Sequence, residues 1–107
     1  MSKPVDLGQG LLTGAAEDLL TIASNRRVSI TSITLCCVDT ANQVCNVYLQ
    51  RSAATKRRIT PKDLICRPGQ LVILNDGYTL GSGDKITADS ASANVIEWTI
   101  SGDEDSG

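Results

Sequence analysis

The stretch from Leu80 to Gly102 constrains the fold more than any other part of the sequence, because apolar residues recur there at every second position. Gly81, Gly83 and Asp84 supply turn-forming residues before the first alternating run, and a Ser-Ala-Ser-Ala-Asn connection precedes the second. The apolar positions are Ile86 and Ala88, then Ile96, Trp98 and Ile100. Strict period two is typical of half-buried strands that turn one face to a core. We therefore expect two consecutive strands of an all-β domain.

The rest of the sequence repeats short apolar runs separated by turn-forming residues. Further strands are predicted at Leu11–Leu12, Asp18–Ala23, Arg27–Val38, Val44–Gln50, Leu71–Leu74 and Tyr78–Leu80. The length of 107 residues suits one domain that buries about 65% of its unfolded surface. We predict an antiparallel β-sandwich or jelly-roll-like barrel of about seven to eight short strands. Its expected core residues are Ile33, Leu35, Val47, Leu49, Val72, Ile86, Trp98 and Ile100.

The longest predicted strand, Arg27–Val38, contains a break in its alternation. The apolar positions on one parity are Val28 and Ile30, and those on the other are Ile33, Leu35 and Cys37. A β-bulge adds one residue to a strand and so reverses the parity beyond it. We predict a bulge near Thr31 and Ser32, which turns both sets of side chains towards the core.

The two ends of the chain differ in composition from the alternating centre. Residues 1–10 contain Pro4, Gly8 and Gly10, and we expect them to form an extended N-terminal arm with little secondary structure. Residues 11–102 are then the β-sandwich domain, and residues 103–107 are an acidic C-terminal tail. The N-terminus lacks the apolar core of a signal peptide, and no apolar run approaches the ~18 residues of a membrane span.

Four cysteines invite a comparison with metal sites: Cys36, Cys37, Cys45 and Cys66. The chain has no histidine and no Cys-x-x-Cys pair, so the usual zinc spacings are unmatched and we predict no metal or cofactor. A disulfide from Cys36 or Cys37 to Cys45 across a hairpin is geometrically feasible. Because no export signal points to an oxidising compartment, we expect reduced and mostly buried thiols.

No set of residues in the sequence predicts an enzyme. Serine and threonine nucleophiles lack a histidine base. The run from Gly81 to Asp84 resembles part of a phosphate-binding loop, but no Lys-Ser/Thr pair follows and a strand comes next. A tight turn explains this run better, and we expect a non-enzymatic protein.

The segment from Arg51 to Arg67 is the strongest candidate for a functional surface. It carries six cations against Asp63 alone, a net charge of +5, while the whole chain carries −2 and the remainder therefore −7. The candidate partner-binding residues are Arg51, Lys56, Arg57, Arg58, Lys62 and Arg67. Such polarity favours an acidic protein partner, and the alternative is a solvated loop that keeps the chain soluble. Nucleic acid is disfavoured, because aromatic residues for base stacking are missing from the segment and the whole chain is acidic.

Two long stretches resemble a group of small virion proteins of tailed bacteriophages. They are DLLTIASNRRVSITSITLCCVDTANQVCNVYL and PGQLVILNDGYTLGSGDKITADSASANVIEWTISG, which together span about Glu17 to Gly102. The shared pattern is a long strand, a small polar turn, a VYL-like strand, a Pro-Gly turn and a Leu-x-x-Gly-Asp-x-Ile hairpin ending in Ile-Ser-Gly. This chain departs from it at Cys37–Val38, where the pattern has an asparagine, and in its basic middle segment.

The resemblance implies a structural role in a virion, assembled in the host cytoplasm. We expect a capsid decoration or cement protein that binds and stabilises the coat-protein lattice. The expected partners are the major capsid protein or another virion protein, and further copies in a homo-oligomer, with no membrane. One alternative is a tail or neck component. Another is a receptor- or carbohydrate-binding module, for which Tyr48 and Tyr78 are the only tyrosines.

Overall fold

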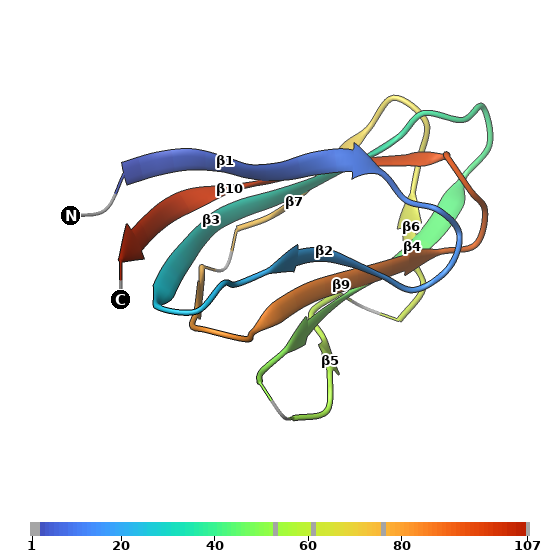
Figure 1. The fold of residues 1–107 in the computed structure, drawn as a ribbon. Helices are drawn as coiled ribbons and strands as arrows, with labels where there is room; N and C mark the ends of the chain where they lie inside the picture. Colours follow the sequence, from blue (N-terminus) through green and yellow to red (C-terminus); the bar gives the residue numbers. More distant parts are fainter. Residues whose placement is uncertain (1–2, 53, 61, 76, 107) are drawn as a thin grey trace.

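The structure, a computed structural model, describes residues 3–52, 54–60, 62–75 and 77–106. In these residues ten strands form two antiparallel sheets that lie face to face (Figure 1). The strands are β1 (Lys3–Leu11), β2 (Glu17–Thr21), β3 (Arg26–Cys37), β4 (Gln43–Gln50), β5 (Arg57–Arg58), β6 (Leu64–Cys66), β7 (Leu71–Leu74), β8 (Tyr78–Leu80), β9 (Lys85–Ser90) and β10 (Ile96–Ser106). The same residues contain no helix that is long and apolar enough to cross a membrane.

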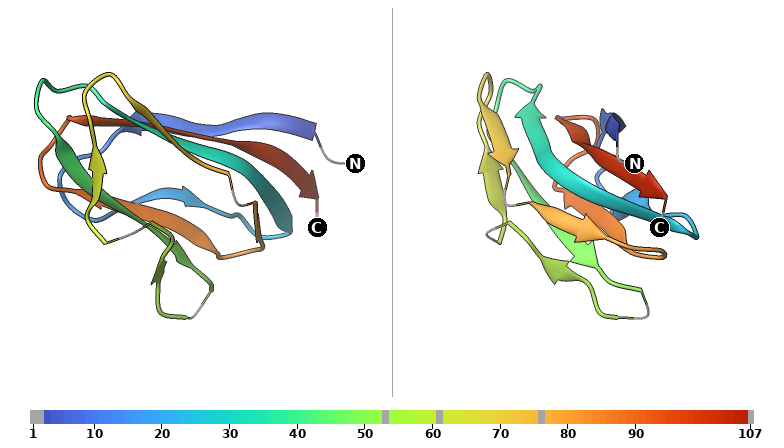
Figure 2. Two further views of the ribbon diagram at one scale, coloured as in Figure 1. Left: turned by 180° about the vertical axis from the view of Figure 1, so that it is seen from behind. Right: turned by 90° about the vertical axis from the view of Figure 1, so that its left-hand side faces the viewer.

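Each sheet has three long strands and an edge that is divided between two short strands (Figure 2). In the β10 sheet the order is β1, β10, β3, and both β7 and β8 pair with the outer edge of β3. In the β9 sheet the order is β2, β9, β4, and both β5 and β6 pair with the outer edge of β4. The predicted all-β sandwich is confirmed. The described residues hold more strands than predicted, because β5 and β6 are too short to recognise by alternation.

The core lies between the two sheets and matches the predicted positions closely. Six of the eight expected residues are buried: Ile33, Leu35, Val47, Ile86, Trp98 and Ile100. The other two, Leu49 and Val72, are partly buried and pack against this cluster. The expected burial of thiols holds for Cys37, Cys45 and Cys66, whereas Cys36 is half-buried on the outer face of β3.

The bulge predicted in the longest strand is present at the expected place. Ser101 of β10 pairs with Ser32, but the next residue, Gly102, pairs with Ile30. Thr31 is therefore the extra residue, and the apolar side chains on both sides of it are buried. Gly102 lies so close to β3 that a Cβ atom there would overlap the carbonyl oxygen of Ser29. This glycine is required by a close approach of two backbones.

The predicted N-terminal arm is wrong for residues 3–10, which belong to β1 and pair with β10. Gly8 and Gly10 make room for an aromatic ring in the core. A Cβ atom on Gly8 would lie 3.1 Å from the Trp98 ring, and one on Gly10 would lie 3.4 Å from Trp98 Nε1. The Trp98 ring can thus pack across β1 because glycine has no side chain at either position. Residues 1 and 2 lie outside the described residues.

The predicted acidic tail is also wrong for residues 103–106. They continue β10 and pair with the first residues of β3, from Arg26 to Ser29. The boundaries proposed for a separate arm, domain and tail therefore disappear. One sandwich includes residues 3 to 106, and residue 107 lies outside the description.

Candidate protein-binding surface

The basic segment lies along the outer edge of the β9 sheet. After β4 ends at Gln50, the chain returns as β5 and then as β6, and both short strands pair with β4. Figure 1 shows the connection around β5 projecting from the body of the sandwich. Since few backbone hydrogen bonds hold a two-residue strand, side chains here are presented on a small, exposed hairpin.

Arg51 is used by the fold. Its Nη1 donates to Asp84 Oδ2 at 3.0 Å and to the Thr79 carbonyl oxygen at 2.6 Å. The Asp84 carboxylate also accepts hydrogen bonds from the backbone N–H groups of Ser52, at 2.8 Å, and Gly81, at 2.9 Å. Burial alone raises the pKa of Asp84. The two N–H groups and Arg51 lower it by more, so the pKa is below its ordinary value. Arg51 therefore fixes the start of the basic segment to the turn before β9.

Lys56 contacts a polar network on the outer face of the β9 sheet. Its Nζ lies 4.4 Å from the centroid of the Tyr48 ring. The Tyr48 hydroxyl donates to Asp89 Oδ2 at 3.0 Å, and burial together with this hydrogen bond raises the pKa of Tyr48. Asn46 Nδ2 donates to Asp89 at 3.1 Å and to Asp63 at 3.2 Å. Both carboxylates of this network thus accept a hydrogen bond from Asn46, and Asp89 accepts a second from Tyr48.

Arg57 and Arg58 form β5 and lie opposite Leu49 and Tyr48 of β4. Both side chains are exposed, and so is Lys62. None of the three forms an ion pair with any residue that the structure describes. We call Lys56, Arg57, Arg58 and Lys62 the basic surface, since all four belong to the edge hairpin and loop that follow β4. Arg57 lies opposite Leu49 and Arg58 opposite Tyr48, so their side chains leave opposite faces of the sheet.

Arg67 lies apart from the basic surface. It begins the turn between β6 and β7, which the N–H of Gln70 closes on the Arg67 carbonyl oxygen at 3.1 Å. The preceding residue, Cys66, pairs with Gln43, whereas Arg57 pairs with Leu49. Six residues of extended strand separate these positions, which is roughly 20 Å. Of the six predicted cations, four therefore lie on the edge hairpin and the loop after it, Arg51 is held by Asp84, and Arg67 is remote.

Sequence reasoning missed an apolar surface on β7. Leu71 and Ile73 are 58% and 53% exposed, and they point to the outer face of the β10 sheet. Leu71 lies opposite the half-buried Cys36 of β3. Val72 is among the expected core residues, but a run of four apolar residues gives no sign that Leu71 and Ile73 on the other face are exposed. We call Leu71 and Ile73 the β7 apolar edge.

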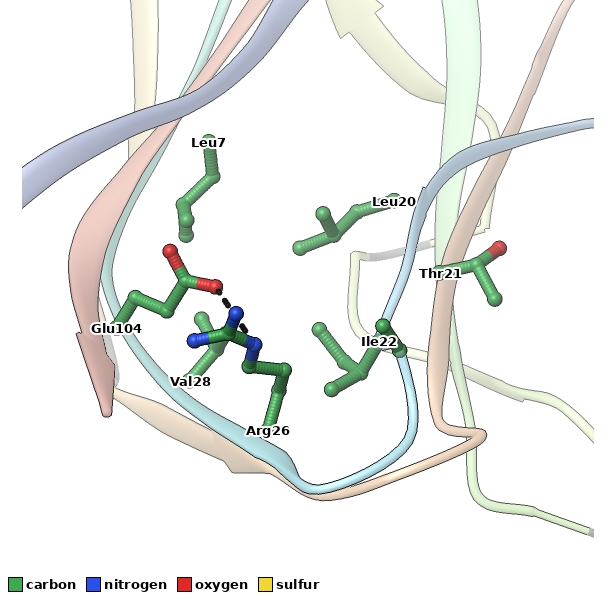
Figure 3. A pocket seen from close by; sticks show the side chains of 8 residues that line it. Leu7, Leu20, Thr21, Ile22, Arg26, Val28 and Glu104 are labelled. Carbon is green, nitrogen blue, oxygen red and sulfur yellow. Dashed lines mark ion pairs between the residues drawn. The ribbon is translucent and has the colours of Figure 1, made fainter. Parts of the chain in front are cut away.

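A cavity of about 350 Å³ opens between the sheets at the end where β1 and β2 lie (Figure 3). Leu7, Leu20, Ile22 and Val28 provide apolar walls. At its mouth Arg26 Nε lies 3.9 Å from Glu104 Oε1. The cavity contains no nucleophile with a neighbouring base, and no group of three metal-binding side chains occurs among the described residues. Its lining consists of apolar walls and one ion pair at the mouth, and these residues do not suggest a particular reaction.

No protein-family model and no curated protein matches the sequence significantly. Among solved structures, the fold is similar to one from a study of Bacillus endospore appendages, described as a family of disulfide-linked pili. The alignment has a TM-score of 0.57 and 11% sequence identity, and covers 99% of this chain and 87% of the other. At this identity the likeness shows a shared fold.

Proposed function

We propose that this chain is a non-enzymatic structural protein of a bacteriophage virion, which binds the coat-protein lattice as a decoration or cement protein. The observation that carries the proposal is the basic surface, where Arg57, Arg58 and Lys62 have no ion-pair partner within the described residues. The resemblance of residues 17–102 to small virion proteins supplies the setting. Both support an acidic protein surface, repeated over a particle, as the partner.

The basic surface acts through charge complementarity. Cations that are unpaired in the free chain remain available to carboxylates on a partner, and they steer the approach of the two surfaces. Exposed ion pairs contribute only about 0.2–1 kcal/mol each, so four cations alone do not hold one chain firmly. Stable attachment needs apolar contacts or several linked copies, and a homo-oligomer would supply the linked copies.

The N-terminal segment is not part of this proposal. Residues 3–11 pair with β10, so an arm laid along a neighbouring subunit would have to leave the sheet first. That exchange would expose Trp98, which packs on Gly8 and Gly10. Docking through the rigid body of the sandwich requires no such loss.

A second candidate function, a subunit of a self-assembled fibre, is favoured by the β7 apolar edge. Within the described residues, β7 and β1 are opposite edges of the β10 sheet, and neither pairs with a further strand there. Joining the β7 edge of one copy to the β1 edge of the next is a head-to-tail contact, which extends into a filament unless its rotation closes a ring. The likeness in fold to a family of disulfide-linked pili supports this candidate.

A receptor- or carbohydrate-binding module finds less support in the side chains. Sugar recognition uses exposed aromatic faces, but Lys56 lies over the Tyr48 ring and Tyr78 packs against the core. A tail or neck component would use the same basic surface on a different partner. The two roles therefore differ only in where on the virion the chain binds.

Cryo-electron microscopy of purified particles, from a host that carries this gene, tests the proposal. We expect the chain to copurify with the particles and to give repeated density over the capsid lattice. Density at the neck or tail would overturn the decoration role and keep the virion role. Absence from particles, together with filaments formed by the purified chain alone, would replace the proposal with the second candidate.

A further inference from the structure

Two thiols lie side by side inside the sandwich. Cys45 of β4 and Cys66 of β6 are fully buried, and their sulfur atoms are 3.5 Å apart. In the pairing of these strands Cys45 lies opposite Leu64 and Cys66 lies opposite Gln43. The two cysteines are therefore diagonal neighbours on the inward face of one strand pair. Their separation along the chain is 21 positions.

The other two cysteines have different surroundings. Cys37 Sγ lies 3.3 Å from the Ala41 carbonyl oxygen, and Cys36 Sγ lies 3.9 Å from the Cys37 carbonyl oxygen. Only Cys45 and Cys66 contact each other among the described thiols. To become a disulfide their sulfur atoms must approach by about 1.5 Å, from 3.5 Å to the ~2.05 Å of an S–S bond.

We propose that Cys45 and Cys66 are the site of an intrachain disulfide, which forms in an oxidising environment and ties β6 to β4. The loop that it closes contains Arg51 and the whole basic surface. The disulfide thus anchors both ends of the segment that presents these cations: β4 at one end and β6 at the other. This inference does not depend on the proposed function.

A small-molecule disulfide such as oxidised glutathione is a sufficient oxidant. One cysteine thiolate attacks it, forms a mixed disulfide and releases one molecule of reduced glutathione. The second cysteine then attacks the protein sulfur of the mixed disulfide and releases the other. Two protein thiols lose two electrons and two protons, and both glutathione halves leave as thiols.

Access to the sulfur atoms controls how fast this reaction proceeds. The contact between the two thiols raises the pKa of Cys45 and lowers the pKa of Cys66, so Cys66 is the better first nucleophile. Both sulfur atoms are nevertheless buried away from a soluble oxidant. Because β6 is three residues long and lies at a sheet edge, its opening exposes both sulfur atoms without unfolding the long strands. Oxidation is therefore expected to be slow in the folded protein and fast during refolding.

The test is to refold the full chain from urea in excess oxidised glutathione and, separately, in reductant. After oxidation we expect two alkylatable thiols instead of four, a mass lower by about 2 Da and a peptide link between Cys45 and Cys66. The oxidised chain should melt roughly 10 °C or more above the reduced chain, since the link restricts the unfolded state. The variant Cys36→Ala/Cys37→Ala should still lose two thiols, and Cys45→Ala/Cys66→Ala should lose none.

Because alanine at two core positions can weaken the fold, the peptide map of the unaltered chain decides the matter. A link between Cys45 and Cys66 as the main product supports the inference. Four free thiols after oxidative refolding, or a link that uses Cys36 or Cys37, would overturn it.

Discussion

Arg51 and the Arg57–Arg58 pair belong to one basic segment but stand in different environments. Arg51 bonds the buried Asp84 carboxylate in the turn before β9 and the Thr79 carbonyl oxygen of β8. Arg57 and Arg58 lie on an edge strand and pair with no carboxylate among the described residues. Local net charge is therefore a poor guide to a binding surface. What separates a structural cation from an available one is a carboxylate 33 positions away in the sequence.

One sandwich carries both kinds of cation, and the largest effect on its stability is expected in its core, at Trp98. Replacing Trp98 with Ala should lower the free energy of unfolding by about 3–5 kcal/mol, because a large ring in the core is lost. Urea unfolding followed by circular dichroism measures this. Trp98→Phe is the matched control and should cost less. A cost below about 1 kcal/mol for Trp98→Ala would mean that the sandwich does not rest on this residue.

The next largest effect is expected at Asp84, the carboxylate that pairs with Arg51. Asp84→Asn should lower the free energy of unfolding at neutral pH by about 2 kcal/mol, because the bonds of a charged acceptor are weakened. The pKa of Asp84 is lower in the folded chain than its ordinary value of 3.8. Its contribution is therefore present above that value and is lost as the pH falls through the folded pKa. The free energies of unfolding of the native chain and of Asp84→Asn should become equal as the pH falls into the acid range. A difference between them that does not change with pH would contradict the role given to Asp84.

A smaller effect is expected at Gly8, where β1 meets the core. Gly8→Ala places a methyl group 3.1 Å from the Trp98 ring and should cost about 1–2 kcal/mol in unfolding free energy, as overpacking does. Gly81→Ala is a matched control, since no atom lies within 4 Å of a Cβ there. A Gly8→Ala variant as stable as the control would show that β1 detaches easily from the sheet. It would support the extended N-terminal arm that the sequence predicted.

The smallest effect on stability is expected at the basic surface. Arg57→Ala/Arg58→Ala should change the unfolding free energy by less than about 0.5 kcal/mol, because both side chains are exposed and unpaired. Arg51→Ala should cost more, since it leaves Asp84 without its ion pair. Equal stabilities of the two variants in urea would remove the distinction between structural and available cations.

Alternation predicted most of the fold because half-buried strands turn one face to a core. The bulge at Thr31 was predictable for the same reason, since only one extra residue brings Ile30 and Ile33 to the same side. The error at residues 3–10 has a definite cause. Gly8 and Gly10 indicate flexibility when only the local sequence is considered, whereas in the fold they accommodate Trp98, which is 88 positions away from Gly10.

The candidate surface could be predicted only as a segment. Its six cations can be read from the sequence, but which of them are held by the fold and which are available depends on distances that the sequence does not contain. Arg51 meets Asp84 through the pairing of β4 with β9, and Arg67 is carried away by the short strand β6. The contact of Cys45 with Cys66 has the same origin, because it depends on the register of β6 against β4.

We propose that exposed, unpaired cations on β5 dock this sandwich onto a repeating acidic surface. The direct measurement is the occupancy of the purified chain on virions that lack their own copy, at low and at physiological salt. Arg57→Ala/Arg58→Ala should reduce occupancy, most clearly at low salt, because exposed charges are screened within ~8–10 Å at physiological ionic strength. Arg67→Ala, which removes a remote cation, should reduce it less. Unchanged occupancy of Arg57→Ala/Arg58→Ala at both salt concentrations would contradict the claim.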